Sequence, residues 1–169
     1  TEQAVERGVA AFQAGAAIVT DTNMAKAGVS KAALSKLGGQ VHCFMADPEV
    51  AAAAKAQEVT RAVVCMEKAA REFPGAVLAV GNAPTALLKL CELMEGGLRP
   101  ALVVGVPVGF VNVVESKERV LAVCEKYGVP CIAAMGRKGG SNVAAAICNA
   151  ILYTALGAVD PAKRQEALK

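Results

Sequence analysis

Short runs of apolar residues alternate along this chain with longer stretches in which apolar residues recur every three or four positions. The clearest run is AVLAV at residues 76–80, whose small and branched side chains continue without a polar break. Such a run is typical of a strand that is buried on both faces. Similar runs lie at residues 16–19, 41–46, 101–104 and 130–135. The pattern therefore predicts five buried strands.

The stretches between these strands have helical periodicity, and none of the connections has a hairpin signal. We expect helices at residues 2–14, 23–37 (with a break at Gly28 and a restart at Ser30), 47 to about 73, 84–95, 115–127 and from 141 onward. Strands that alternate with helices predict an α/β fold. We expect one domain over residues 1–169, a single doubly wound, mainly parallel five-stranded sheet with helices on both faces.

Several residues are typical of helix ends. Pro84 suits a first helical turn because its missing N–H would lack a partner there, and Gly128 suits the position after a helix. Ser141 is expected to cap the last long helix. Residues 139–159 carry no charge and approach the length of a membrane span, but their polar side chains favour a helix buried against the sheet or in a subunit contact. The polar tail, residues 161–169, is expected to fray or to form a short surface helix.

Composition argues against a nucleic-acid partner. The chain is 54% hydrophobic but only 4% aromatic, without tryptophan, so bases would find few rings on which to stack. The formal net charge of +3 is also too small for a phosphate-tracking surface. Residues 1–12 have the pattern of an amphipathic helix and not of a signal peptide. We therefore expect neither a nucleic acid nor a membrane as partner.

The six cysteines each fall inside an apolar strand or helix pattern, where cysteine behaves as a small hydrophobic residue. They stand at positions 43, 65, 91, 124, 131 and 148, and no two have the spacing of a metal site. The sequence therefore predicts reduced thiols in a cytoplasmic protein and no bound metal.

Polar and glycine-rich stretches follow four of the predicted strands. Because the carboxyl ends of parallel strands meet at one edge of a sheet, these stretches should face a common crevice, where open α/β sheets bind ligands. The stretches are residues 21–24, 81–85, 105–109 and 136–141. The helix that follows residues 76–80 should also present free N–H groups there. The alternative is that the glycines only make tight turns between strands and helices.

The loop GRKGGS, residues 136–141, predicts an anion site. Arg137 and Lys138 stand before a helix, where a cation is unfavourable by about 0.3–1 kcal/mol, so folding alone would prefer acidic residues. Glycines on both sides and Ser141 at the cap complete an anion-binding pattern. The alternative is that both side chains extend into solvent.

Two other kinds of chemistry have weaker signals. Neither GVPVG nor GRKGGS matches a dinucleotide or P-loop fingerprint, so nucleotide binding is disfavoured. His42, the only histidine, lies in an apolar strand, where a packed or edge-exposed imidazole is the simple interpretation. A catalytic role for His42 stays open because histidine titrates near neutral pH.

Three long motifs resemble the precorrin-8X methylmutase family, including its cobalt-precorrin-8 branch. They are GNAPTAL, GVPVGFVNVVESKE and GRKGGSNVAAAICNA, in that order and each after a predicted strand, and DTNMAKAG and the segment around Thr60-Arg61 are similar too. The resemblance covers the chain from its first helix to about Leu156. It implies an isomerase of cobalamin biosynthesis, in which a methyl group moves from C11 to C12 of a corrin-ring tetrapyrrole to give hydrogenobyrinate or cobyrinate.

The same resemblance implies the other properties of the site. The methyl shift needs no redox cofactor and no nucleophile, only protonation or tautomerisation of the macrocycle, and the protein is expected to be a homodimer without a cofactor. The substrate's acetate and propionate carboxylates suit the Arg137-Lys138 loop. The predicted crevice and the family resemblance together indicate a set of candidate substrate-binding residues. They are Asp21, Met24, Thr60, Arg61, Gly81, Asn82, Thr85, Gly105, Val106, Pro107, Gly109, Glu115, Ser116, Lys117, Gly136, Arg137, Lys138, Gly139 and Ser141.

The sequence departs from the family at the proton donor. Members usually begin with a further segment that carries an Arg-x-x-His motif, whose histidine is assigned that role, and His42 does not match the motif. We expect either that an N-terminal portion is missing here or that this is a shortened homologue, so the catalytic residue stays unassigned. The alternatives to an isomerase are a non-enzymatic corrinoid carrier and an α/β protein that binds another polycarboxylate or phosphate ligand.

Overall fold

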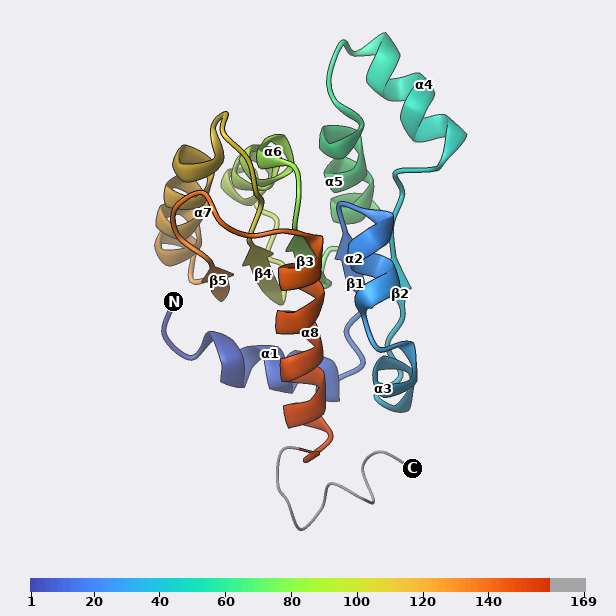
Figure 1. Cartoon of the computed structure of the whole chain (residues 1–169), viewed down its shortest axis with the longest axis vertical. Coiled ribbons are helices and arrows are strands. Elements are labelled where there is room, and N and C mark those ends of the chain that lie inside the picture. Colours follow the sequence, from blue (N-terminus) through green and yellow to red (C-terminus); the bar gives the residue numbers. More distant parts are fainter. Residues whose placement is uncertain (159–169) are drawn as a thin grey trace.

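The computed structural model describes residues 1–158, and its centre is a five-stranded sheet (Figure 1). Every pair of neighbouring strands is parallel, in the order β2-β1-β3-β4-β5. The strands are β1 (Ile18–Thr20), β2 (Val41–His42), β3 (Val77–Val80), β4 (Leu102–Gly105) and β5 (Cys131–Ala133). The α/β prediction is confirmed, and the sheet is wholly parallel.

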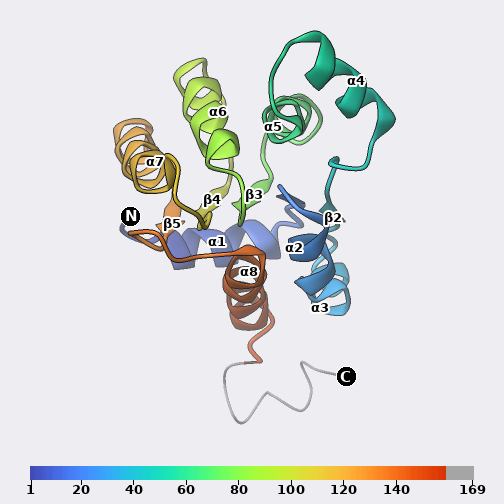
Figure 2. The same ribbon diagram turned by 45° about the horizontal axis from the view of Figure 1, so that its top comes forward.

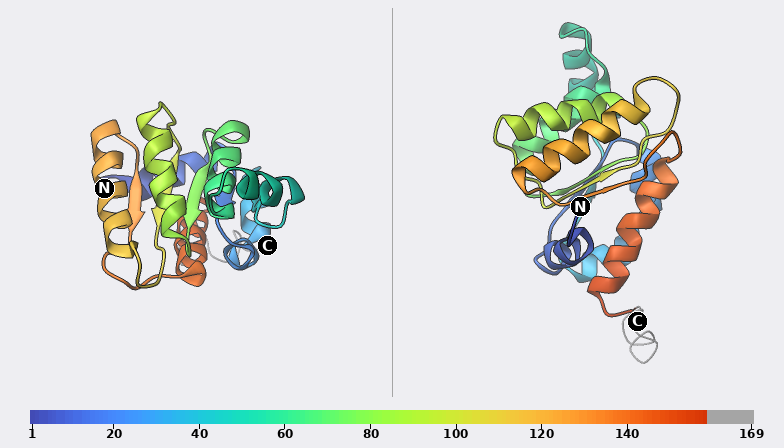
Figure 3. Two further views of the ribbon diagram at one scale, coloured as in Figure 1. Left: turned by 90° about the horizontal axis from the view of Figure 1, so that it is seen from above. Right: turned by 90° about the vertical axis from the view of Figure 1, so that its left-hand side faces the viewer.

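Eight helices lie within the described residues and cover both faces of the sheet. They are α1 (Ala4–Gln13), α2 (Asn23–Gly28), α3 (Lys31–Lys36), α4 (Pro48–Ala56), α5 (Arg61–Glu72), α6 (Pro84–Glu95), α7 (Val113–Tyr127) and α8 (Ser141–Ala155). Figure 2 shows α4 to α7 on one side of the strands and α1, α2, α3 and α8 on the other. The right-hand view of Figure 3 shows the same two layers with the sheet between them.

Successive strand residues supply opposite halves of the core. In β3, Leu78 and Val80 pack with the side chains of α4 to α7, whereas Val77 and Ala79 pack with those of α1, α3 and α8. The four residues of β3 are all buried. This explains why the sequence showed a continuous apolar run, since neither face of a covered parallel sheet meets water.

The structure corrects two of the predicted elements. The helix expected from residue 47 to about 73 is two helices, because Glu58 has a left-handed backbone (φ 56°) and the Thr60 hydroxyl caps α5 by accepting from the Val63 N–H. The strand expected at 41–46 ends at His42, since β2 is an edge strand and residues 43–46 have no strand partner. The predicted break at Gly28 and restart at Ser30 are confirmed, with Ser30 as the cap of α3.

The uncharged stretch at residues 139–159 contributes α8, which packs against α1, α2 and the sheet. None of the helices in residues 1–158 has both the length and the apolar character that crossing a bilayer requires. The expected burial against the sheet is therefore confirmed. The tail prediction for residues 161–169 falls outside the described residues.

The strand order places the topological switch point between β1 and β3, because the chain goes outward from β1 to β2 and then returns to β3. Asp21 follows β1 at this point and is only 1% exposed. Its two carboxylate oxygens accept hydrogen bonds from the backbone N–H groups of Gly81, Asn82 and Ala83, each at 2.8 Å. One buried side chain therefore ties the loop after β1 to the loop after β3.

We expect Asp21→Asn to lower the free energy of unfolding. The amide keeps one acceptor oxygen and turns an NH2 group towards at least one of the three N–H donors. A buried donor without a partner costs about 1–3 kcal/mol, and this loss outweighs the relief from removing a buried charge. Chemical denaturation should show a lower midpoint for this variant.

Glu118→Gln is the matched control, because Glu118 is exposed on α7. The control should unfold at the wild-type denaturant concentration. Equal midpoints for Asp21→Asn and Glu118→Gln would contradict a structural role for the Asp21 hydrogen bonds.

Candidate functional site

Four loops meet at the carboxyl end of the sheet, and hydrogen bonds join them. We call this area the carboxyl-end surface; it comprises residues 21–24, 81–85, 106–112 and 134–141. The Thr22 and Ser141 hydroxyls lie 2.7 Å apart although 119 residues separate them. The Gly140 N–H donates to the Val106 carbonyl at 2.8 Å. Figure 1 shows the last loop, in orange, passing over the ends of β4 and β3 to reach α8.

Two glycines allow the loop that leads to α8 to pass over the ends of β4 and β3. A Cβ atom on Gly139 would collide with the Val106 carbonyl oxygen, and one on Gly81 would lie 2.6 Å from the Ser141 Cα. Only residues without a side chain permit the backbones to approach so closely. At these two positions the glycines therefore do more than complete a turn between a strand and a helix.

The sequence predicted free N–H groups at the start of the helix that follows β3. Asp21 binds the backbone N–H groups of residues 81–83, which precede that helix, so its carboxylate fixes the turn from within. Burial raises the pKa of the Asp21 carboxyl, while the backbone N–H groups of the turn act in the opposite direction. Contact with a ligand is left to the exposed Asn82 side chain and the half-buried Thr85.

Thr60 joins the same turn from a different helix. Its hydroxyl lies 3.0 Å from that of Thr85 and also caps α5. The neighbouring Arg61 is exposed, and its guanidinium donates to the Met45 carbonyl at 3.4 Å. The structure therefore brings Thr60 beside the GNAPT turn, whereas the contact of Arg61 is with the loop that precedes α4.

The loop between β5 and α8 has exposed cations and free helix amides. Arg137 and Lys138 are exposed, and neither forms an ion pair with a residue in the described part of the chain. Ser141 was expected to cap α8, but Gly140 holds the cap position and the Ser141 hydroxyl faces Thr22. No side chain in the described residues caps α8, so its first N–H groups can donate hydrogen bonds to an anion.

Several candidate residues are buried and support the surface from below. Val106 and Pro107 are buried under the crossing loop, and Gly105 ends β4 against the Leu87 side chain. The Ser116 hydroxyl donates to the Val113 carbonyl at 2.9 Å, and Lys117 is completely buried. By contrast, Met24 and Glu115 are exposed, and Gly109 and Gly136 have positive φ angles in their loops.

Sequence reasoning named only one member, Met24, of an apolar component of this surface. Seven large hydrophobic side chains are exposed in residues 1–158, and five of them belong to the carboxyl-end surface. They are Met24, Val108, Phe110, Val111 and Met135, with Phe110 86% exposed. The signal was the loop GVPVGFVN itself, because it combines a phenylalanine and three valines outside any predicted strand or helix. Exposed apolar side chains that gather in this way are typical of a binding surface.

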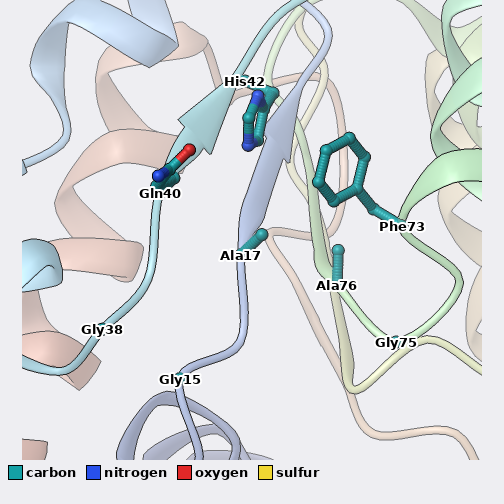
Figure 4. A pocket seen from close by; sticks show the side chains of 8 residues that line it. All are labelled: Gly15, Ala17, Gly38, Gln40, His42, Phe73, Gly75 and Ala76. Carbon is teal, nitrogen blue, oxygen red and sulfur yellow. The ribbon is translucent and has the colours of Figure 1, made fainter.

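His42 lies away from this surface. Its ring stacks on Phe73, with centroids 4.3 Å apart, and burial followed by the charge of Lys26 lowers its pKa. Both rings line a cavity of about 380 Å³. Figure 4 shows how the residues that line it are arranged. The other residues that line this cavity precede β1, β2 and β3: Gly15, Ala17, Gly38, Gln40, Gly75 and Ala76. His42 itself ends β2, but its ring faces this cavity, which lies towards the amino ends of the strands.

Within residues 1–158, no three side chains of histidine, cysteine, aspartate or glutamate gather closely enough to hold a metal ion. The carboxyl-end surface offers instead apolar side chains, two unpaired cations, free amides and a few hydroxyls. This combination suits a large ligand that has apolar faces and several anionic groups.

Comparison with known proteins agrees with this chemistry. The family model described as precorrin-8X methylmutase matches residues 1–154. Cobalt-precorrin-8 methylmutase from Priestia megaterium is 44% identical over 88% of this chain and 64% of its own length. The corresponding enzyme from Salmonella typhimurium is 47% identical over 80% of this chain and 62% of its own length. The chain thus spans slightly less than two thirds of these relatives.

A solved structure is similar over a larger share. The precorrin-8X methylmutase of Thermus thermophilus superposes with a TM-score of 0.82 at 41% identity, covering 93% of this chain and 75% of that one. The match of the family model, the sequence identities and the shared fold lead to one conclusion. This chain belongs to the precorrin-8X methylmutase family.

Proposed function

We propose that the carboxyl-end surface binds a corrin-ring tetrapyrrole and that the protein moves a methyl group from C11 to C12 of precorrin-8X or cobalt-precorrin-8. Family membership is the observation that carries this proposal. The surface supports it, because exposed apolar side chains suit the faces of a macrocycle. The cations Arg137 and Lys138 suit the carboxylates on its rim.

The reaction makes modest demands on the protein. Substrate and product are isomers: the bond between the methyl group and C11 breaks, the bond to C12 forms, and no electrons are gained or lost. The protein therefore has to hold one conformation of the ring and to assist a proton shift on it. Positioning and general acid assistance are the two effects available, and the second contributes about 10²–10⁴ in rate.

The residues of the carboxyl-end surface are better suited to positioning the substrate than to general acid catalysis. The surface contains no histidine, and its buried carboxyl, Asp21, is engaged by three N–H donors. We infer that the proton donor is not His42, because that ring faces a cavity at the amino end of the sheet. The same observation favours the second candidate function, a corrinoid carrier that binds the ring without converting it.

We further propose a homodimer in the cytoplasm. The family resemblance supports the dimer. The location is supported by the six cysteines, all of which are buried as free thiols. Free thiols persist in a reducing compartment.

Removing either exposed cation should weaken ligand binding without harming the fold. Arg137→Ala and Lys138→Ala should each reduce the affinity for hydrogenobyrinic acid by about tenfold or more, since a charge-assisted contact is worth about 1.5–3 kcal/mol. The melting temperature should stay constant or rise slightly, because a cation before a helix is unfavourable. Visible-spectrum titration and thermal unfolding measure the two effects. A lower melting temperature with unchanged affinity would show that these residues are structural.

The exposed phenylalanine should contribute through apolar contact. Phe110→Ser should weaken the binding of hydrogenobyrinic acid by about tenfold or more, since burying a phenylalanine side chain is worth about 1.5–3 kcal/mol. Val5→Ser is the control, because Val5 is an exposed apolar residue on α1, outside the carboxyl-end surface. If both variants bind as tightly as the wild type, the apolar side chains do not contact the ligand.

His42→Ala should leave product formation from precorrin-8X unchanged, because the imidazole lies outside the proposed site. The comparison requires equal amounts of folded protein, since the variant also loses the stacking on Phe73. A fall in rate of 10² or more with normal ligand affinity would make His42 the general acid and overturn our assignment.

A further inference from the structure

Lys117 on α7 has an unusual environment for a lysine. The residue has no exposed surface. Its ammonium group donates to the carbonyl oxygens of Gly136 and Lys138, at 2.8 and 2.7 Å. These two carbonyls flank Arg137 in the loop that leads to α8. A side chain from one helix therefore holds both ends of the segment that carries the exposed cations.

Fold stability alone does not account for a lysine at this position. Within residues 1–158, Lys117 forms no ion pair, whereas Lys68 and Lys89 each have carboxylate partners. A buried charge without an opposite charge is costly, and burial lowers the pKa of the Lys117 ammonium accordingly. An apolar residue of similar length would fill the same space without this cost.

The Lys117 ammonium is explained if it holds the loop at residues 136–138 in one conformation that can bind an anion. Lys117 directs the carbonyls of residues 136 and 138 inward, and the side chains of Arg137 and Lys138 are exposed. None of the three cations has a carboxylate partner among the described residues. A polycarboxylate ligand would supply the missing negative charge.

We propose that Lys117 is a positioning residue that holds the 136–138 loop so that Arg137 and Lys138 receive the carboxylates of the ligand. This inference rests on the proposed function for the nature of the ligand, but not for the contact between Lys117 and the loop. Lys117 acts through the loop and does not itself touch the ligand.

The first experiment tests the contact without any ligand. Trypsin cuts after arginine and lysine where the chain opens locally, so Arg137 and Lys138 are natural probes of their own loop. In Lys117→Met, cleavage after residue 137 or 138 should be at least about tenfold faster than in the wild type. Lys126→Met is the matched control on the same helix, since Lys126 is exposed and contacts Tyr127. It should be cut at the wild-type rate.

The second experiment tests positioning. Lys117→Met should bind hydrogenobyrinic acid about tenfold more weakly than the wild type, and Lys126→Met should bind normally. In a chain that already carries both Arg137→Ala and Lys138→Ala, adding Lys117→Met should have almost no further effect, because its influence passes through those two side chains. A merely structural lysine would weaken binding equally in both backgrounds.

The outcomes separate the two proposals. If the wild type does not bind hydrogenobyrinic acid, the proposed function is wrong, and the trypsin rates still decide whether Lys117 holds the loop. Unchanged trypsin rates in Lys117→Met, or faster cleavage with wild-type affinity, would overturn the inference. If Lys117→Met does not fold, Lys117→Gln is the second variant. It removes the charge, is too short to reach both carbonyls, and should shift both measurements in the same direction.

Discussion

The arrangement of the carboxyl-end surface depends on the buried carboxylate of Asp21. It lies at the point where the chain changes direction in the sheet, and three backbone amides converge on it. In most α/β proteins of this kind, amides at the switch point are left for a ligand. Here they are satisfied by the protein itself. The turn is therefore rigid before any ligand arrives, and binding has to use side chains and the neighbouring loops.

A second buried charge of opposite sign supports the other half of the surface. Lys117 holds the loop between β5 and α8 through its carbonyls, as Asp21 holds the turn after β3 through its amides. Burial removes water from both charged groups, and hydrogen bonds to the backbone compensate for this loss. The exposed groups of the surface are carried by these two supported segments and by the loops beside them. They include hydroxyls, an amide, two cations and several apolar side chains. Such preorganisation reduces the ordering cost of binding a large ring.

Much of this could be predicted from the sequence, because the pattern of a parallel sheet is simple. The buried strands, the helices between them and the convergence of the glycine-rich loops all follow from apolar runs and turn residues. The division between α4 and α5 could not be predicted, since it depends on a left-handed Glu58 that no glycine marks. The contacts that Asp21 and Lys117 make with the backbone were also hidden. Residue type indicates that a side chain is charged, but only the tertiary structure shows whether it faces a ligand or the protein's own backbone.

The contact between Thr22 and Ser141 has a consequence for how the site comes into being. It joins a loop near the start of the chain to a helix near its end, and Gly81 and Gly139 bring the intervening segments into the same place. Contacts between residues so distant in sequence require large loops to close and tend to form late in folding. The carboxyl-end surface is therefore not a property of any local segment. A corrinoid bound there would stabilise the completed sheet and helix packing specifically, so that affinity for the ligand and integrity of the whole fold are thermodynamically linked.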